Sequence, residues 1–98
     1  MEHKFEWDQN KAQINLKKHQ VDFDEAKTVF DDPLACIFDD QRHSFGETRE
    51  IIIGFSSKNR LLLVCFTERN NNIIRIFSSR LATKTERRNY ESNNPFSF

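Results

Sequence analysis

The sequence predicts an α+β domain in which helices from both ends of the chain surround an antiparallel sheet. Three observations support this class. Two helical patterns occupy roughly the first 30 residues, four apolar stretches separated by polar turns follow, and a third helical pattern begins near residue 84. Helices grouped around consecutive strands are typical of α+β folds. A chain of 98 residues has room for one hydrophobic core and not for two.

The N-terminal segment contains the first helix. Residues 4–7 alternate polar and apolar side chains, which is consistent with a short additional strand. Asp8 then stands where an N-cap residue is expected, and a helix is predicted over residues 11–19. The i, i+4, i+7 spacing places three side chains on one face of this helix, namely Ala12, Leu16 and His19. A neighbouring stripe is either a solvated face or a binding surface, and it consists of Lys11, Asn15 and Lys18.

A second helix is predicted directly after the first. Asp22 and Glu25 have the spacing of a capping box, in which Asp22 accepts from the Glu25 amide while Glu25 reaches back. The helix is expected to run to about Phe30 and to face inward through Phe23, Ala26 and Phe30. It ends at 31–33, because the residue before Pro33 is disfavoured in helical geometry.

The middle of the chain predicts an antiparallel meander of four strands. The strands are expected at residues 34–38, 48–55, 61–68 and 73–79, with turns at 39–46, 56–59 and 70–72. The continuous apolar run at 61–64 indicates a central strand that is covered on both faces.

The C-terminal segment predicts one more helix. Thr83 and Glu86 form a second capping-box pattern, which opens a helix that runs to about Glu91. Residues 92–98 are expected to be a frayed tail. A single domain over residues 1–91 therefore accounts for the pattern.

Several classes of protein are excluded by composition and motif. No apolar run approaches the roughly 18–20 residues of a membrane-spanning helix, and the first residues lack the apolar stretch of a signal peptide. A cytoplasmic protein is therefore expected, with Cys36 and Cys65 as thiols. The sequence contains no CxxC, HExxH, EF-hand, GxGxxG, P-loop or GxSxG motif, and its only glycines are Gly46 and Gly54. No metal or cofactor is expected.

Charge is distributed unevenly along the chain, although the net charge is zero. Residues 1–50 carry seven Lys/Arg and twelve Asp/Glu, whereas residues 51–98 carry eight and three. Either the two halves pair with each other or the basic half binds an anionic partner. Most cations of the basic half are arginines, whose planar guanidinium suits bidentate phosphate contact: Arg60, Arg69, Arg75, Arg80, Arg87 and Arg88.

Two of these arginines share one predicted strand. Arg75 and Arg80 are five positions apart, so strict alternation would direct them to opposite faces. A bulge or a turn would be needed to bring both to one site. The structural alternative for Arg75 is a salt bridge to Glu50 or Glu68 on a neighbouring strand.

Three other side chains are candidates for proton transfer. Glu68 is the only acidic residue between Glu50 and Glu86, and it is either a general base or the partner of Arg75. His19 and His43 can transfer protons near neutral pH. Alternatively, His19 complements the dipole at the end of its helix, and His43 is an exposed loop residue.

Many short stretches match a known family in order along the chain. In the first half they are Phe5–Asp8, Lys11, Asn15, Lys18–His19, Val21, Phe23, Ala26, Val29–Pro33, Asp40–His43, Gly46–Glu47 and Arg49. In the second half they are Ile53–Gly54, Ser56, Thr67–Arg69, Ile74–Ile76, Ser78, Arg80, Ala82–Thr83, Glu86–Arg87 and Tyr90–Glu91. On these residues the chain resembles the BrnT toxins, small bacterial ribonucleases of type II toxin–antitoxin systems with a fold similar to that of RelE-type toxins.

The resemblance implies an enzyme that cleaves RNA and thereby inhibits translation and growth. Because no metal-binding motif is present, a metal-independent reaction is expected. It implies catalytic roles for Arg75 and Arg80 on the scissile phosphate, with protons handled by Glu68, His19 or His43. Binding of the RNA strand would fall to basic residues at matching positions, namely Lys11, Lys18, Arg42, Arg49 and Arg69.

The resemblance also implies a partner, a cognate antitoxin with a ribbon–helix–helix DNA-binding domain. The heteromeric complex would repress its own operon, so that operator DNA is contacted through the antitoxin. The competing hypothesis is a non-catalytic module that binds nucleic acid or an acidic protein through the same basic residues. A third alternative is a toxin fold that has lost its activity.

Overall fold

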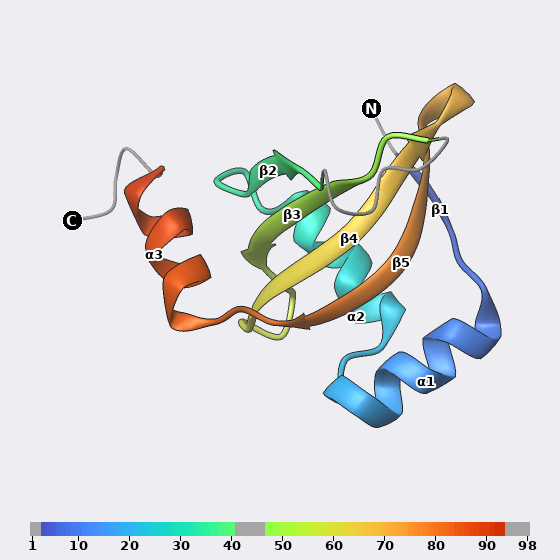
Figure 1. Ribbon diagram of the computed structural model, residues 1–98, viewed down its shortest axis with the longest axis horizontal. Coiled ribbons are helices and arrows are strands. Elements are labelled where there is room, and N and C mark those ends of the chain that lie inside the picture. Colours follow the sequence, from blue (N-terminus) through green and yellow to red (C-terminus); the bar gives the residue numbers. More distant parts are fainter. Residues whose placement is uncertain (1–2, 41–46, 94–98) are drawn as a thin grey trace.

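Five strands form one mixed sheet in the computed structural model, which describes residues 3–40 and 47–93 (Figure 1). In sequence order, the strands are β1 (Lys4–Glu6), β2 (Cys36–Asp39), β3 (Glu50–Phe55), β4 (Leu61–Arg69) and β5 (Ile73–Leu81). Their order across the sheet is β1-β5-β4-β3-β2. The helical elements are α1 (Gln9–His19), α2 (Phe23–Ala26), the 3-10 helices η1 (Lys27–Asp31) and η3 (Asn70–Asn72), and α3 (Lys84–Ser92).

The predicted α+β class is confirmed, and the sheet needs one correction. Strands β2 to β5 form the predicted antiparallel meander. The short β1 adds a fifth strand, which pairs in parallel with the last strand, β5. The sheet is therefore mixed and not purely antiparallel. Phe5 anchors β1, because its ring packs against the ring of Phe30, with the two centroids 5.3 Å apart.

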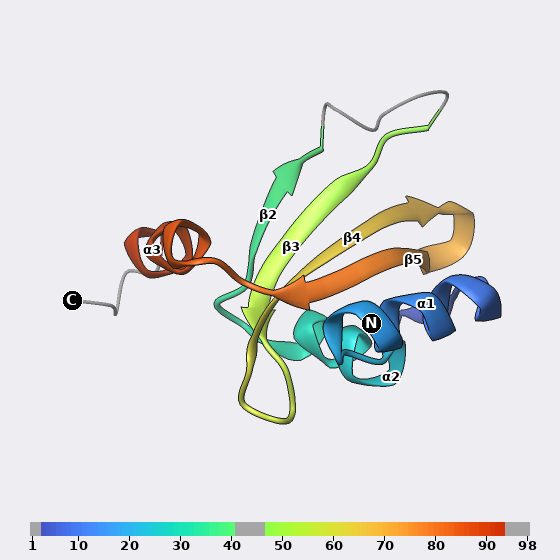
Figure 2. The ribbon, with the colours of Figure 1, turned by 60° about the horizontal axis from the view of Figure 1, so that its bottom comes forward.

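The larger hydrophobic core lies on the sheet face that α2 and η1 cover (Figure 2). Alternate strand residues point into it, and Leu62 and Val64 of β4 are completely buried there. Leu61 and Leu63 of the same strand are buried on the opposite face, against α3. The prediction of a central strand covered on both faces is confirmed.

A β-bulge interrupts the pairing of β5 with β4. Cys65 pairs with Ser78, but the next residue of β4, Phe66, pairs with Ile76, so Phe77 has no partner across the strand. The extra residue reverses the alternation of β5 beyond that point. Arg75 and Arg80 consequently lie on the same face, which is the arrangement that strict alternation would have prevented.

The second helix differs from its prediction. Asp22 caps it by accepting from the Glu25 amide, but the Glu25 side chain does not return to Asp22. Instead the Glu25 carboxylate is buried, accepts from Ser56 Oγ at 2.6 Å and forms an ion pair with Arg60. The expected capping box at Asp22 is therefore wrong, because Arg60 holds the carboxylate. The helix also tightens into 3-10 geometry from Lys27 onward.

The Asp32 carboxylate links the C-terminal helix to β3. Asp32 Oδ2 accepts from the Phe55 N–H at 2.8 Å and from the Tyr90 hydroxyl at 2.9 Å. Burial and this hydrogen bond raise the pKa of Tyr90 to about 12. The predicted Thr83–Glu86 capping box is present at the start of α3. Within residues 3–40 and 47–93, none of the helices has the length and hydrophobicity needed to span a bilayer.

Candidate functional site

A cleft of about 750 Å³ opens on the sheet face opposite α2. Its floor is formed by side chains of β3, β4 and β5, including Ile51, Leu63 and Cys65. The end of α1 and the start of α3 border it from two sides. Its polar lining mixes cations and carboxylates: Lys18, His19, Arg80, Asp39, Asp40 and Glu86.

One buried amide fixes α1 beside this cleft. Asn15 is 6% exposed, and its Nδ2 donates to the carbonyl oxygens of Val21 at 3.0 Å and Ser79 at 2.8 Å. Its Oδ1 accepts from the Ser79 N–H at 3.0 Å. Leu16, which the sequence places on one face with Ala12 and His19, is 43% exposed. Asn15 therefore lies at the centre of the buried face of α1. Its amide satisfies backbone groups of β5 that would otherwise be unpaired.

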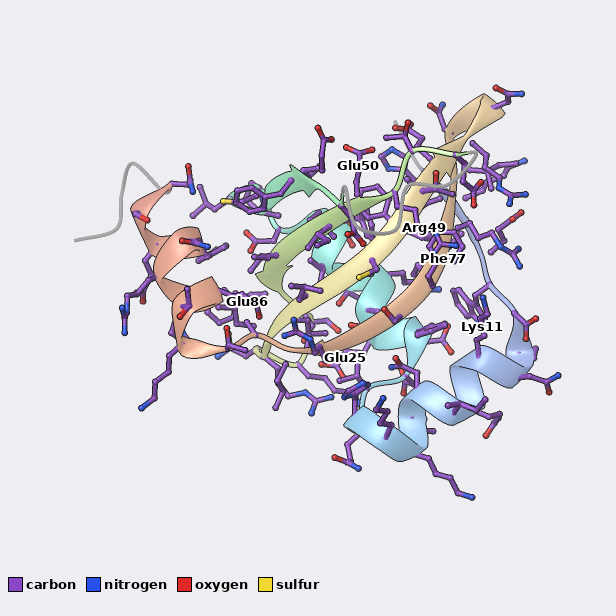
Figure 3. All side chains as sticks on the ribbon, viewed as in Figure 1. Lys11, Glu25, Arg49, Glu50, Phe77 and Glu86 are labelled. Carbon is purple, nitrogen blue, oxygen red and sulfur yellow. The ribbon has the colours of Figure 1, made fainter. Side chains whose placement is uncertain are left out.

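A cation–aromatic stack stands at one end of the open face. The guanidinium carbon of Arg49 lies 3.9 Å from the centroid of the Phe77 ring, and Lys11 Nζ lies 5.6 Å from it. Figure 3 shows Phe77 between Arg49, which precedes β3, and Lys11 of α1. The bulge presents this ring on the open face. The cations of Arg49 and Lys11 and the ring of Phe77 therefore form a flat, positively charged surface.

A second arginine is held at the opposite end. Arg80 Nη1 and Nη2 donate to the two carboxylate oxygens of Glu86 at 2.7 and 2.9 Å. The same carboxylate accepts from the Thr83 N–H. The hydrogen bond from Arg80 lowers the pKa of Glu86, because it stabilises the ionised carboxylate. Glu86 therefore fixes the orientation of the guanidinium in the cleft.

The amino-acid sequence that builds this site matches the model of a known protein family. The family model described as the ribonuclease toxin BrnT of type II toxin–antitoxin systems matches residues 7–86. This chain belongs to the BrnT family. A search among curated proteins finds no match.

A solved BrnT toxin has the same fold. The crystal structure of the Brucella abortus ribonuclease toxin BrnT superimposes with a TM-score of 0.64 at 24% sequence identity. The match covers 85% of this chain and 100% of that chain. At 24% sequence identity, this similarity supports a shared fold and carries no conclusion about function.

Arg75 lies on the open face but outside the cleft of this BrnT chain. Its Nη1 donates to Glu6 of β1 at 2.9 Å, and neither Glu50 nor Glu68 is its partner. Arg69 lies within 4 Å of the same Glu6 carboxylate. Arg75 and Arg80 are five positions apart along an extended strand, which corresponds to about 15 Å. The structure therefore does not bring the two arginines to one phosphate.

Glu68 points to the other face of the sheet. It pairs with Ile74, whose side chain is in the core under α2, and alternation along β4 places it two residues after Phe66 on that side. Burial raises the pKa of its neighbour Glu50, and the charges of Asp39 and Glu68 add to this effect. Glu68 is therefore separated by the sheet from the arginines with which the sequence grouped it.

The remaining predicted residues divide into two groups. Lys18 and His19 line the cleft, and Lys11 and Arg49 flank it through Phe77. Arg42 and His43 lie outside the described residues. Phe77 and Glu86 were not predicted as members of the site, because neither stands out from the pattern of its strand or capping box.

No group of three or more His, Cys, Asp or Glu side chains within residues 3–40 and 47–93 is arranged to hold a metal ion. Both cysteines are free thiols, and burial raises the pKa of Cys65 on the cleft floor. The cleft therefore offers cations, carboxylates, a thiol and the His19 imidazole as its polar groups.

Proposed function

We propose that this BrnT chain is a metal-independent endoribonuclease whose activity inhibits translation and growth. The observation that carries the proposal is the cleft itself, where His19, Lys18 and Arg80 lie on one surface. A proton-transfer group beside fixed cations is what cleavage by an internal nucleophile requires.

The proposed reaction is transesterification within the RNA. The 2′-hydroxyl oxygen attacks the adjacent phosphorus, a P–O bond to the 2′-oxygen forms, and the bond to the 5′-oxygen breaks. A base takes the proton of the 2′-hydroxyl, and an acid returns one to the departing 5′-oxygen. The products are a 2′,3′-cyclic phosphate and a 5′-hydroxyl. Each proton-transfer group contributes about 10²–10⁴-fold to such a step.

The residues of the cleft are assigned to these tasks by position. His19 serves as the proton-transfer residue. Arg80, oriented by Glu86, stabilises the negative charge that develops on the phosphate oxygens. Lys11, Lys18 and Arg49 bind the backbone of the strand. Arg69 and Arg75 are assigned to backbone binding beyond the cleft, and Glu68 has no assigned role, because it faces away.

The test is cleavage by purified toxin that has been separated from any partner. We expect RNA to be cut in the presence of excess EDTA, with 2′,3′-cyclic phosphate ends. His19→Gln should lose most of this activity, whereas the exposed control Gln13→Ala should retain it. Retention of RNA without cleavage by the folded wild-type protein would support the binding module instead. If RNA is cut in the absence of EDTA but not in its presence, the proposed metal independence is wrong.

The second part of the proposal concerns the partner protein, an antitoxin. We expect a ribbon–helix–helix protein that covers the open face with acidic or apolar side chains and represses the shared operon as a complex. Complementary charge speeds association at low salt. Co-purification from a tagged operon tests the partner, and an association rate that is unchanged between low and high salt would argue against charge steering.

A further inference from the structure

A smaller pocket of about 200 Å³ lies between α1 and the bulge of β5. One wall is the ring of Phe77, and another is Ile14 of α1. Ile14 is 64% exposed, which makes it the most exposed large apolar side chain within the described residues. Lys18 and His19 line this pocket and also the larger cleft, so that the two spaces adjoin.

We propose that this pocket binds one unpaired nucleobase of the RNA strand, at the nucleotide next to the scissile phosphate. The inference rests on the proposed ribonuclease function and names a subsite for its substrate. A nucleobase is flat and apolar on its faces, and it is attached to an anionic backbone. A pocket with an aromatic wall, an aliphatic wall and cations at its edge is complementary to that chemistry.

The bulge prepares the aromatic wall. Phe77 has no cross-strand partner, and the guanidinium of Arg49 packs on its ring at 3.9 Å. The ring is therefore held in position before RNA binds. Lys11 also approaches the ring, but its side chain is exposed and free to rotate toward a phosphate.

The position of the pocket determines which nucleotide of the RNA strand it binds. A base between Phe77 and Ile14 places its sugar and phosphate toward Lys18 and His19, which belong to both spaces. Bases inside a duplex are paired and stacked, so only a single-stranded or extruded base can enter. The pocket thereby favours cleavage in unpaired RNA.

The experiment uses 2′-O-methyl RNA hexamers, which bind but lack the attacking hydroxyl. Each hexamer carries a single fluorescent 2-aminopurine, whose emission is quenched by stacking, at one of its six positions. A matched set carries an abasic site at the same position. With wild-type toxin we expect quenching at one position, and abasic replacement there should weaken binding about fivefold or more, the equivalent of about 1 kcal/mol of stacking.

Phe77→Leu should abolish the quenching and remove the penalty of the abasic site, while circular dichroism verifies that it is folded. Ile14→Ala, on an exposed position, should reduce the penalty. Leu16→Ala is the matched control on the same helix and should change neither value. An abasic penalty that is equal in wild type and both pocket variants would overturn the proposal.

The two proposals fail in different ways. Cleavage of natural RNA without position-specific quenching would remove the nucleobase pocket and leave the nuclease in place. Quenching that depends on Phe77 without any cleavage would keep the pocket as a base-binding site and remove the nuclease.

Discussion

Asn15 and Ser79 exchange two hydrogen bonds across 64 positions of sequence, one through the Ser79 carbonyl and one through its N–H. These bonds connect the middle of α1 to β5 just beyond the bulge at Phe77. Lys11 and His19 lie one turn on either side of Asn15 on the helix. The distance between α1 and the cleft floor is thus set by one buried amide.

Replacing Asn15 by Leu should lower both stability and activity. The Ser79 N–H and carbonyl would remain buried without a partner, which costs about 1–3 kcal/mol for an unsatisfied group. Urea unfolding should show this loss, and RNA cleavage by the folded fraction should fall as α1 moves. The exposed Gln13→Ala provides the control. Equal midpoints and rates in the two variants would show that the amide does not position the helix.

Arg80 and Arg75 should respond differently to alanine substitution. Arg80 lines the cleft, and loss of a group that stabilises developing charge costs about 10²–10³-fold in kcat. Arg75 is bound to Glu6 outside the cleft, so Arg75→Ala should keep cleavage within about threefold. Single-turnover cleavage of the same RNA compares them. The reverse order would place the reacting phosphate beside Glu6.

Glu86→Gln isolates the orienting role of the carboxylate. The amide oxygen of glutamine still accepts from the Thr83 N–H, so the start of α3 is retained. Arg80 loses its ionic partner, and kcat should fall about 10- to 100-fold because the guanidinium is misplaced. KM should not rise, since the freed cation still attracts RNA. In an Arg80→Ala background the same change should have no further effect on kcat.

Acid should weaken the link between α2 and the β3–β4 turn. Hydrogen bonding to Arg60 lowers the pKa of Glu25 in the folded state. The ionised carboxylate therefore stabilises the fold fully above its unfolded pKa of about 4.3, and this contribution is lost as pH falls below that value. The gap in unfolding free energy between wild type and Glu25→Gln should be constant from about pH 7 to 5 and shrink toward pH 3. A gap that does not depend on pH would contradict this role.

The elements that local sequence determines were predictable, and the contacts between distant segments were not. Apolar runs and capping residues located the central strands and the third helix. The five-residue spacing of Arg75 and Arg80 showed only that a bulge or a turn would be needed to bring both side chains to one site. Nothing local to Asn15 shows that it faces Ser79, and nothing near Glu25 shows that Arg60 will draw it inward. Phe77 occupies an ordinary strand pattern until the register shift exposes it.

The pairing of β1 with β5 also governs how the molecule is made. A ribosome releases the N-terminus first, at about 5–20 residues per second. The opening strand and α1 must therefore wait, unpaired, until the segment near Ile73 to Ser79 has emerged from the exit tunnel. The cleft is thus absent from the nascent chain until β5 has been made and released from the ribosome.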